Sequence, residues 1–175
     1  KVWLERWKVT ETGSTSASEF PAVNLSAKEA GVTLELRFTP VKPVVLQGEA
    51  GYSQKGPEKG NASYYYSVPR FAAEGTVIVN GKSHQVMGNS WLDREWSTSA
   101  LGKDQQGWDW FSLHFDDNTE LMFYSLRKSD GTPDIYSKGV YINSEGKSEL
   151  LKYSEVSIKT TETWVNRFGD TYPAA

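Results

Sequence analysis

The 175-residue chain contains no cysteine and only two histidines. Without cysteine it forms no disulfide, offers no thiolate nucleophile and holds no zinc ion through sulfur. Two histidines among scattered carboxylates give no recognisable spacing of metal ligands, so we expect neither a metal nor another cofactor. The sequence also lacks any run of about 18 apolar residues, which a membrane-spanning helix needs.

An excess of positive charge is missing as well. The formal net charge is −3 and the sequence pI is about 5.5. A basic surface is the usual electrostatic mark of proteins that bind nucleic acid or anionic lipid, so we expect neither as a partner. The chain starts at a lysine without a signal peptide, and we therefore expect a mature or trimmed piece of a longer product.

Aromatic residues, by contrast, are plentiful: 7 Trp, 9 Tyr and 7 Phe make up 13% of the chain. Such residues favour strands. Residues 32–39 alternate apolar and polar, Asn80-Gly81 is a strong hairpin turn, and residues 107–115 with 120–128 and 135–143 with 150–163 predict two further hairpins. About nine or ten antiparallel strands favour an all-β up-and-down barrel or a sandwich.

Other stretches carry weaker signals. Residues 21–30 show no clear periodicity, and residues 166–175 have lost the strand pattern and are interpreted as a tail or linker. Gly88, within the return strand of the Asn80-Gly81 hairpin, hints at a bulge or bend.

Residues 84–97 concentrate most of the candidate chemistry. With a period of two, Trp91, Asp93 and Glu95 share one face of a strand, whereas Leu92, Arg94 and Trp96 share the other. Two carboxylates in this arrangement lie roughly 6–7 Å apart along the backbone. They are either part of a charged, solvent-facing strand or the working groups of a pocket.

An aromatic-walled, apolar cavity favours the protonated form of a carboxyl group, which can donate a proton to an alkene or a leaving group. An ionised neighbour can stabilise a cation or activate water. His84 and His114 are candidate general bases, although a lone histidine on a strand is more often a polar surface residue. The tryptophans have two interpretations, a ligand-stacking pocket or plain core packing.

Four motifs occur in order: GYSQKG (51–56), SYYYSVPR (63–70), GNSWLDREWS (88–97) and GWDWF (107–111). Together they resemble the lipocalin-like AttH / carotenoid 1,2-hydratase (CrtC-like) family, often described as predicted secreted hydrolases, and most closely its AttH branch. The resemblance implies a calycin-type, lipocalin-like antiparallel β-barrel of about 8–10 strands over residues 1–165. Residues 166–175 would then be a tail or linker toward a second barrel.

The resemblance also implies a function. An apolar small molecule, such as a lipid or isoprenoid, would bind in the barrel, and Asp93 would assist its hydration, isomerisation or hydrolysis as a proton donor, with Glu95 and His84 auxiliary. The activity would be hydratase-like or hydrolase-like, a lyase of the carotenoid 1,2-hydratase type. The expected ligand-binding residues are Trp91, Trp96, Tyr65, Trp108 and Trp110.

A non-catalytic alternative stays open: a lipid- or pigment-binding carrier module of the cell envelope. Under either interpretation we expect a bacterial periplasmic or secreted protein. Its expected partners are the apolar ligand and either a second lipocalin-like domain or a membrane transporter.

Overall fold

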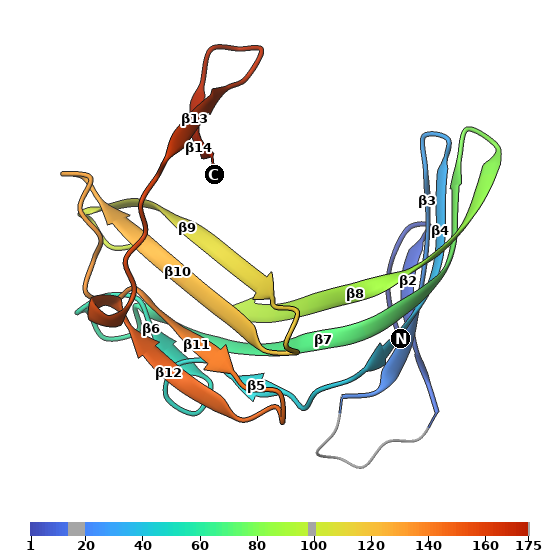
Figure 1. Ribbon diagram of the computed structural model, residues 1–175, viewed down its shortest axis with the longest axis horizontal. Helices are drawn as coiled ribbons and strands as arrows, with labels where there is room; N and C mark the ends of the chain where they lie inside the picture. Colours follow the sequence, from blue (N-terminus) through green and yellow to red (C-terminus); the bar gives the residue numbers. More distant parts are fainter. Residues whose placement is uncertain (14–19, 98–100, 175) are drawn as a thin grey trace.

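The computed structural model describes residues 1–13, 20–97 and 101–174, and these form an all-β protein (Figure 1). The strands lie in three antiparallel sheets of eight, four and two strands. The predicted all-β antiparallel class is therefore confirmed. Within the described ranges the one helical element is a short 3-10 turn, η1 (Tyr153–Glu155), and none is long and apolar enough to cross a membrane.

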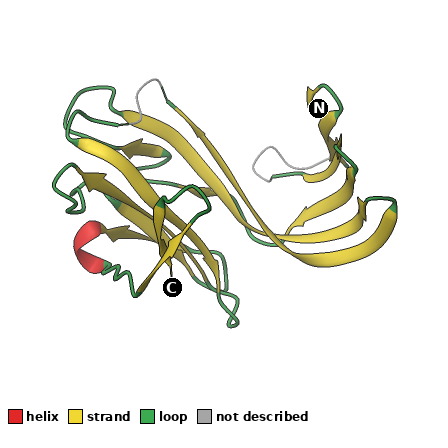
Figure 2. Ribbon diagram, turned by 90° about the horizontal axis from the view of Figure 1, so that it is seen from above, coloured by secondary structure: helices red, strands yellow, loops and turns green. Residues whose placement is uncertain are grey.

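The eight-stranded sheet curls strongly on itself and forms a half-barrel (Figures 1 and 2). Its path runs β1-β2-β3-β4-β7-β5, and β6 and β8 also pair with β7. The strands are β1 (Val2–Leu4), β2 (Trp7–Thr12), β3 (Ala22–Glu29), β4 (Val32–Pro40), β5 (Val45–Leu46), β6 (Tyr52–Gln54), β7 (Ala62–Val79) and β8 (Lys82–Trp96).

The long hairpin of β7 and β8 is the central element of this sheet. It turns at Asn80 and Gly81, whose φ angles of 48° and 80° fit the predicted two-residue turn. Both residues have positive φ, which asparagine and glycine tolerate better than other residues. The hairpin extends well beyond the length expected from the sequence, because β7 alone comprises 18 residues.

A β-bulge divides this hairpin into two parts. Val68 pairs with Leu92 and Phe71 pairs with Ser90, so β7 carries one extra residue at Pro69 and Arg70. Proline has no N–H to donate to the ladder, which explains why the irregularity falls there, and bulges bend and twist the strand that carries them. The prediction of a bulge at Gly88 is wrong, since Gly88 pairs regularly with Ala73.

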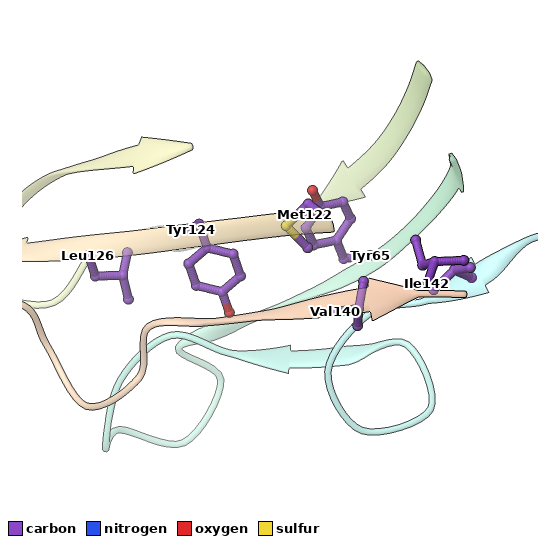
Figure 3. Packing of buried hydrophobic residues seen from close by; sticks show 7 residues of the cluster. Tyr65, Met122, Tyr124, Leu126, Val140 and Ile142 are labelled. Carbon is purple, nitrogen blue, oxygen red and sulfur yellow. The ribbon is translucent and has the colours of Figure 1, made fainter. Parts of the chain in front are cut away.

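The four-stranded sheet covers only one part of the half-barrel (Figure 1). Side chains from both sheets form the hydrophobic core, in which Val45 of β5 and Tyr65 of β7 meet Met122 and Tyr124 of the smaller sheet (Figure 3). The strands of the smaller sheet are β9 (Gln105–His114), β10 (Glu120–Lys128), β11 (Lys138–Ile142) and β12 (Ser148–Lys152).

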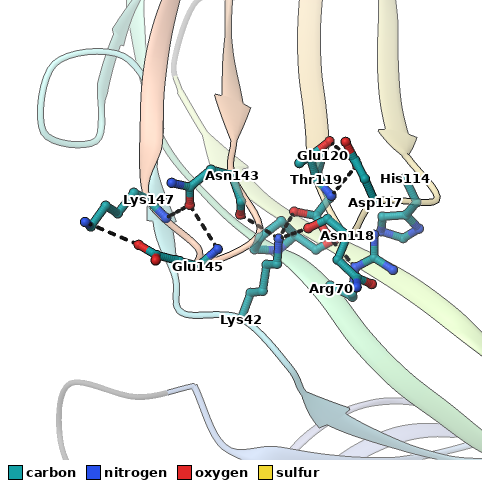
Figure 4. A network of polar contacts seen from close by, with 11 residues as sticks. Lys42, Arg70, His114, Asp117, Asn118, Thr119, Glu120, Asn143, Glu145 and Lys147 are labelled. Carbon is teal, nitrogen blue, oxygen red and sulfur yellow. Dashed lines mark hydrogen bonds and ion pairs between the residues drawn. The ribbon is translucent and has the colours of Figure 1, made fainter.

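A buried ion cluster joins the same two sheets (Figure 4). Glu120, at the start of β10, has a fully buried side chain that contacts Lys42 at 2.6 Å and Arg70 at 2.5 Å. Lys42 also donates to the carbonyl oxygens of Asn118 and, at 2.7 Å, Asn143. The cluster therefore fastens the β4–β5 loop and the β7 bulge to the smaller sheet.

Two stretches without a predicted strand pattern do form strands. Residues 21–30 contain β3, which pairs with β2 and β4 on either side. Residues 166–175 contain β14 (Thr171–Ala174), which pairs with β13 (Glu162–Val165) in a separate hairpin. This hairpin pairs the end of the predicted barrel domain, residues 1–165, with the predicted tail, residues 166–175. A second barrel beyond it stays a prediction.

Candidate functional site

Asp93 lies on β8, just beyond the bulge, and is half-buried. Its carboxylate accepts three hydrogen bonds: from the Tyr65 hydroxyl at 2.9 Å, the Ser67 hydroxyl at 2.5 Å and the Trp91 indole N–H at 2.7 Å. Ser67 in turn accepts from the Gln47 amide at 2.9 Å. The β7–β8 register supplies this arrangement, because Ser67 and Asp93 are directly opposite each other.

Tyr65 connects Asp93 to the smaller sheet. Its hydroxyl oxygen accepts from the Trp110 indole N–H on β9 at 3.2 Å while its own hydrogen points to Asp93. Burial, the largest cause, and the nearby negative charge of Asp93 raise the pKa of Tyr65 well above its ordinary value. The phenol therefore stays neutral and can act as a hydrogen-bond donor over the physiological pH range.

Beside this group lies a cavity of about 210 Å³ between the two sheets. Its floor consists of buried residues, Tyr65, Tyr124 and Leu126, while half-exposed indoles form its rim. Four of the five predicted ligand-binding residues line it. They are Tyr65, Trp96, Trp108 and Trp110.

An ion pair lies in the wall of the same cavity. The Lys55 ammonium is 2.9 Å from Oε1 of Glu95, and this oxygen also accepts from the Ser63 hydroxyl at 2.5 Å. Lys55 lies 3.7 Å from the centre of the Tyr124 ring. Burial lowers the pKa of Lys55 below its ordinary value, and the attraction of Glu95 opposes that shift.

The structure separates the two predicted carboxylates. Asp93, Glu95 and Trp91 share a face as predicted. Asp93 accepts from Tyr65 and Ser67 on β7 and from Trp91 on β8, and Glu95 accepts from Ser63 on β7. Glu95 lines the cavity, whereas Asp93 does not and reaches it only through Tyr65. Trp91 lines a different, apolar groove of about 220 Å³, against Phe38 and Phe71 on the uncovered part of the sheet.

The structure does not bring His84 to this site. His84 is exposed near the Asn80-Gly81 turn, where it pairs with Val77. Asp93 lies nine positions further along the continuous strand, about 30 Å along β8 at the usual rise. The odd difference in number also places the two side chains on opposite faces of β8. His114 lies nearer, with its ring 5.9 Å from the Trp91 indole and Nε2 2.7 Å from the Pro69 carbonyl oxygen.

Sequence reasoning missed several residues of the site, namely Gln47, Lys55, Ser63, Ser67 and Tyr124. Ser63, Tyr65 and Ser67 alternate in the SYYYSVPR motif, and this period of two was a usable signal. Lys55 lies in the loop after β6 and belongs to the GYSQKG motif, but nothing in that motif indicated its partner, which is 40 residues away in sequence.

The arrangement can bind a flat, apolar molecule and expose it to two groups that can transfer a proton. Aromatic rings supply the contact surface, and cations can be stabilised over indole faces. Tyr65 offers a hydroxyl at the cavity wall, backed by a carboxylate, and Glu95 offers a second carboxylate that water can reach, with 40% of its side chain exposed.

The curled antiparallel half-barrel, with a small aromatic cavity against its face, is the architecture of a lipocalin-like domain. The family model described as AttH-like matches residues 1–175, so the chain belongs to the AttH-like family. The resemblance noted from its sequence motifs is thereby confirmed.

Solved structures share this fold. A crystal structure of a Nitrosomonas europaea protein assigned as an AttH matches 95% of this chain and 50% of its own, with 32% identity and a TM-score of 0.84. Kievitone hydratase from Nectria haematococca matches 99% of this chain and 52% of its own, with a TM-score of 0.71 but only 18% identity. The second likeness concerns the fold alone.

Among curated proteins, the kievitone hydratase of Fusarium solani subsp. phaseoli is 25% identical over 131 residues. The alignment covers 71% of this chain and 36% of the relative. The chain thus spans about half the length of the solved relatives and about a third of this curated one. It is an AttH-like domain distantly related to kievitone hydratase.

Proposed function

We propose that this AttH-like domain binds an apolar, unsaturated small molecule in the aromatic cavity and that Asp93, acting through Tyr65, assists addition of water to it. The observation that carries this proposal is the hydrogen bond of 2.9 Å between Asp93 and Tyr65, because it links a carboxyl group outside the cavity to a hydroxyl that lines it. The distant relationship to kievitone hydratase supports hydration as the reaction class.

The proton path is a relay. In the structure the Tyr65 hydroxyl donates to Asp93 and accepts from Trp110. For the relay, Asp93 takes up a proton on the oxygen that faces Tyr65, and the Tyr65 hydrogen turns toward the cavity. The Tyr65 proton then passes to one alkene carbon while the Asp93 proton passes to the Tyr65 oxygen. The cation that forms on the other carbon faces the indole rings of the cavity rim. Water attacks that carbon and gives its proton to Glu95, after which the proton returns to Asp93 through solvent.

Asp93→Asn tests this proposal without emptying the hydrogen-bond cluster. The asparagine oxygen can accept from Ser67 and Trp91, and its amide can donate to the Tyr65 oxygen. Loss of a general acid lowers turnover by about 10²–10⁴-fold. The assay is incubation with kievitone, the compound in the relative's name, and mass spectrometry for the gain of one water.

Tyr65→Phe is the second variant, because it removes the relay hydroxyl while leaving Asp93 with two donors. We expect the same loss of turnover. Asp109→Asn is the matched control, since Asp109 forms an ion pair with Arg127 and lines no part of the cavity. Full turnover in Asp93→Asn would contradict the relay.

The non-catalytic carrier is the second candidate function, and one observation favours it. Three donors from the domain itself already satisfy Asp93, which does not touch the cavity. In a carrier this cluster would only shape the cavity wall. Asp93→Asn would then alter ligand affinity modestly, and the wild type would bind apolar compounds without changing their mass.

We further propose a location in the bacterial envelope and a second lipocalin-like domain or a membrane transporter as protein partner. The groove of about 220 Å³ supports a partner, because Phe38 and Trp91 in its wall are only half-buried, while Phe71 is buried beneath them. Native mass spectrometry of protein from its own host tests the proposal. Detection of the unbound chain alone would count against it.

A further inference from the structure

We propose that Lys55 and Glu95 are specificity-determining residues that recognise a hydroxyl group on the ligand. This inference rests on the proposed use of the aromatic cavity as the ligand site and names the polar group that the ligand carries. The ion pair presents one donor and one acceptor 2.9 Å apart in a wall whose other residues are mostly aromatic.

Lys55 is the buried member of this pair. The residue is 8% exposed, and its backbone is held by two hydrogen bonds, from its N–H to the Asn61 carbonyl at 2.9 Å and from the Gln105 amide to its own carbonyl at 2.7 Å. Gln105 is itself buried. Because its side chain is buried and paired with Glu95, the ammonium is held in position rather than carried on a solvent-exposed side chain.

Glu95 is the only carboxylate that lines this cavity among the described residues. Its Oε1 already accepts from Lys55 and Ser63, whereas no described residue forms a hydrogen bond with Oε2. With 40% of the side chain exposed, Glu95 can rotate slightly to meet a ligand at little cost. Lys55 has two further N–H donors beyond the one used by Glu95.

A hydroxyl group matches this pair because its oxygen accepts from Lys55 while its hydrogen is donated to Glu95. The negative charge of Glu95 would repel a carboxylate ligand, and the positive charge of Lys55 would repel an ammonium ligand. The ion pair has no net charge and thus favours a ligand with an uncharged hydroxyl group on an aromatic or apolar body. A methyl ether of the same body keeps the acceptor but loses the donor.

The test compares 2-naphthol with 2-methoxynaphthalene on the 175-residue chain. Two-dimensional NMR of the indole N–H groups reports binding directly, because Trp96, Trp108 and Trp110 line the cavity. A hydrogen bond to a charged group discriminates by about tenfold or more in dissociation constant. We therefore expect the wild type to bind 2-naphthol about tenfold more tightly.

In Glu95→Gln we expect the preference for 2-naphthol to fall at least threefold, because only the hydroxyl compound donates to Glu95. In Lys55→Met we expect both compounds to bind at least threefold more weakly with the preference kept, and in Asp109→Asn we expect wild-type values. Glu95→Gln serves as the safeguard for folding, since Glu95 is partly exposed, and thermal melting checks both variants. An unchanged preference in Glu95→Gln overturns the role of Glu95, and unchanged affinities in Lys55→Met overturn the role of Lys55, while both results leave the cavity as ligand site. Absence of indole shifts with both compounds in the wild type overturns the ligand site itself.

Discussion

The two parts of the eight-stranded sheet differ in what lies against them. The covered part consists of β5, β6 and the ends of β7 and β8 that lie away from the Asn80-Gly81 turn. It packs on the four-stranded sheet and contributes Val45 and Tyr65 to the core. The open part, made of β1–β4 and the hairpin end of β7 and β8, carries apolar side chains such as Leu25 and Leu36 that are only half-buried. One sheet therefore combines a stable region and an accessible one.

The two parts also bury opposite faces of the same strand. In the open part, Val86 pairs with Gly75, which pairs with Leu36, so the even positions of β8 lie on its apolar face. In the covered part, the odd positions Asp93 and Glu95 face the smaller sheet. The bulge in β7 marks this change, and Asp93 lies beside it. The candidate site thus lies at the boundary where the packed face of the sheet changes from one side to the other.

The comparison predicts its largest effect at the ion cluster that fastens the covered part. Glu120→Ala would leave Lys42 and Arg70 as buried cations without their partner, and breaking a buried ion pair in this way costs about 3–5 kcal/mol. Urea unfolding monitored by tryptophan fluorescence measures the loss in the free energy of unfolding.

Glu35→Ala is the counterpart in the open part. Glu35 is exposed and accepts one hydrogen bond, from the Ser26 hydroxyl at 2.6 Å, so its removal changes the free energy of unfolding by about 0.5 kcal/mol or less. Equal losses in Glu120→Ala and Glu35→Ala would show that the two parts do not differ in stability as described.

The two methionines provide a matched pair for hydrophobic packing. Met122 lies in the covered core with 0% exposure, and Met87 lies in the open part with 89% exposure. Met122→Ala should lower the free energy of unfolding by about 2–4 kcal/mol, because it removes buried apolar contacts and leaves a cavity. Met87→Ala should leave the free energy of unfolding within about 0.5 kcal/mol of the wild type. Urea unfolding of the two variants measures both changes.

Local patterns predicted much of this fold. The alternation of residues 32–39, the Asn80-Gly81 turn and the hairpin of β9 with β10 depend on neighbouring residues, and all three are confirmed. The shared face of Trp91, Asp93 and Glu95 follows from the same period of two. Residues 21–30 escaped prediction because β3 is held by partners on both edges, and such pairing is not visible in a short window.

The site could be predicted only in part. Aromatic residues at strand spacing indicated four of the cavity residues, but the Lys55–Glu95 pair joins positions 40 residues apart, and only the three-dimensional structure brings them together. The period of two predicts the face of β8 on which His84 lies. Its distance from Asp93 could not be predicted, because it depends on the strand running unbroken between the two residues. Sequence alone also could not reveal that Asp93 is saturated by donors of its own domain.

Adjacent tyrosines on opposite faces of β7 give the smallest and most local test. Burial raises the pKa of Tyr65, and of Tyr124 likewise, whereas Tyr64 is exposed. Because the folded state then holds the Tyr65 proton more tightly than the unfolded state, the stability that Tyr65 contributes is fully present below pH of about 10 and is lost as pH rises beyond it. Ultraviolet absorbance at alkaline pH should reveal two late-ionising tyrosines, one of which disappears in Tyr65→Phe and neither of which disappears in Tyr64→Phe. Ionisation of all nine tyrosines in a single early step, with the fold intact by circular dichroism, would mean that Tyr65 faces water and that the cavity floor is misassigned.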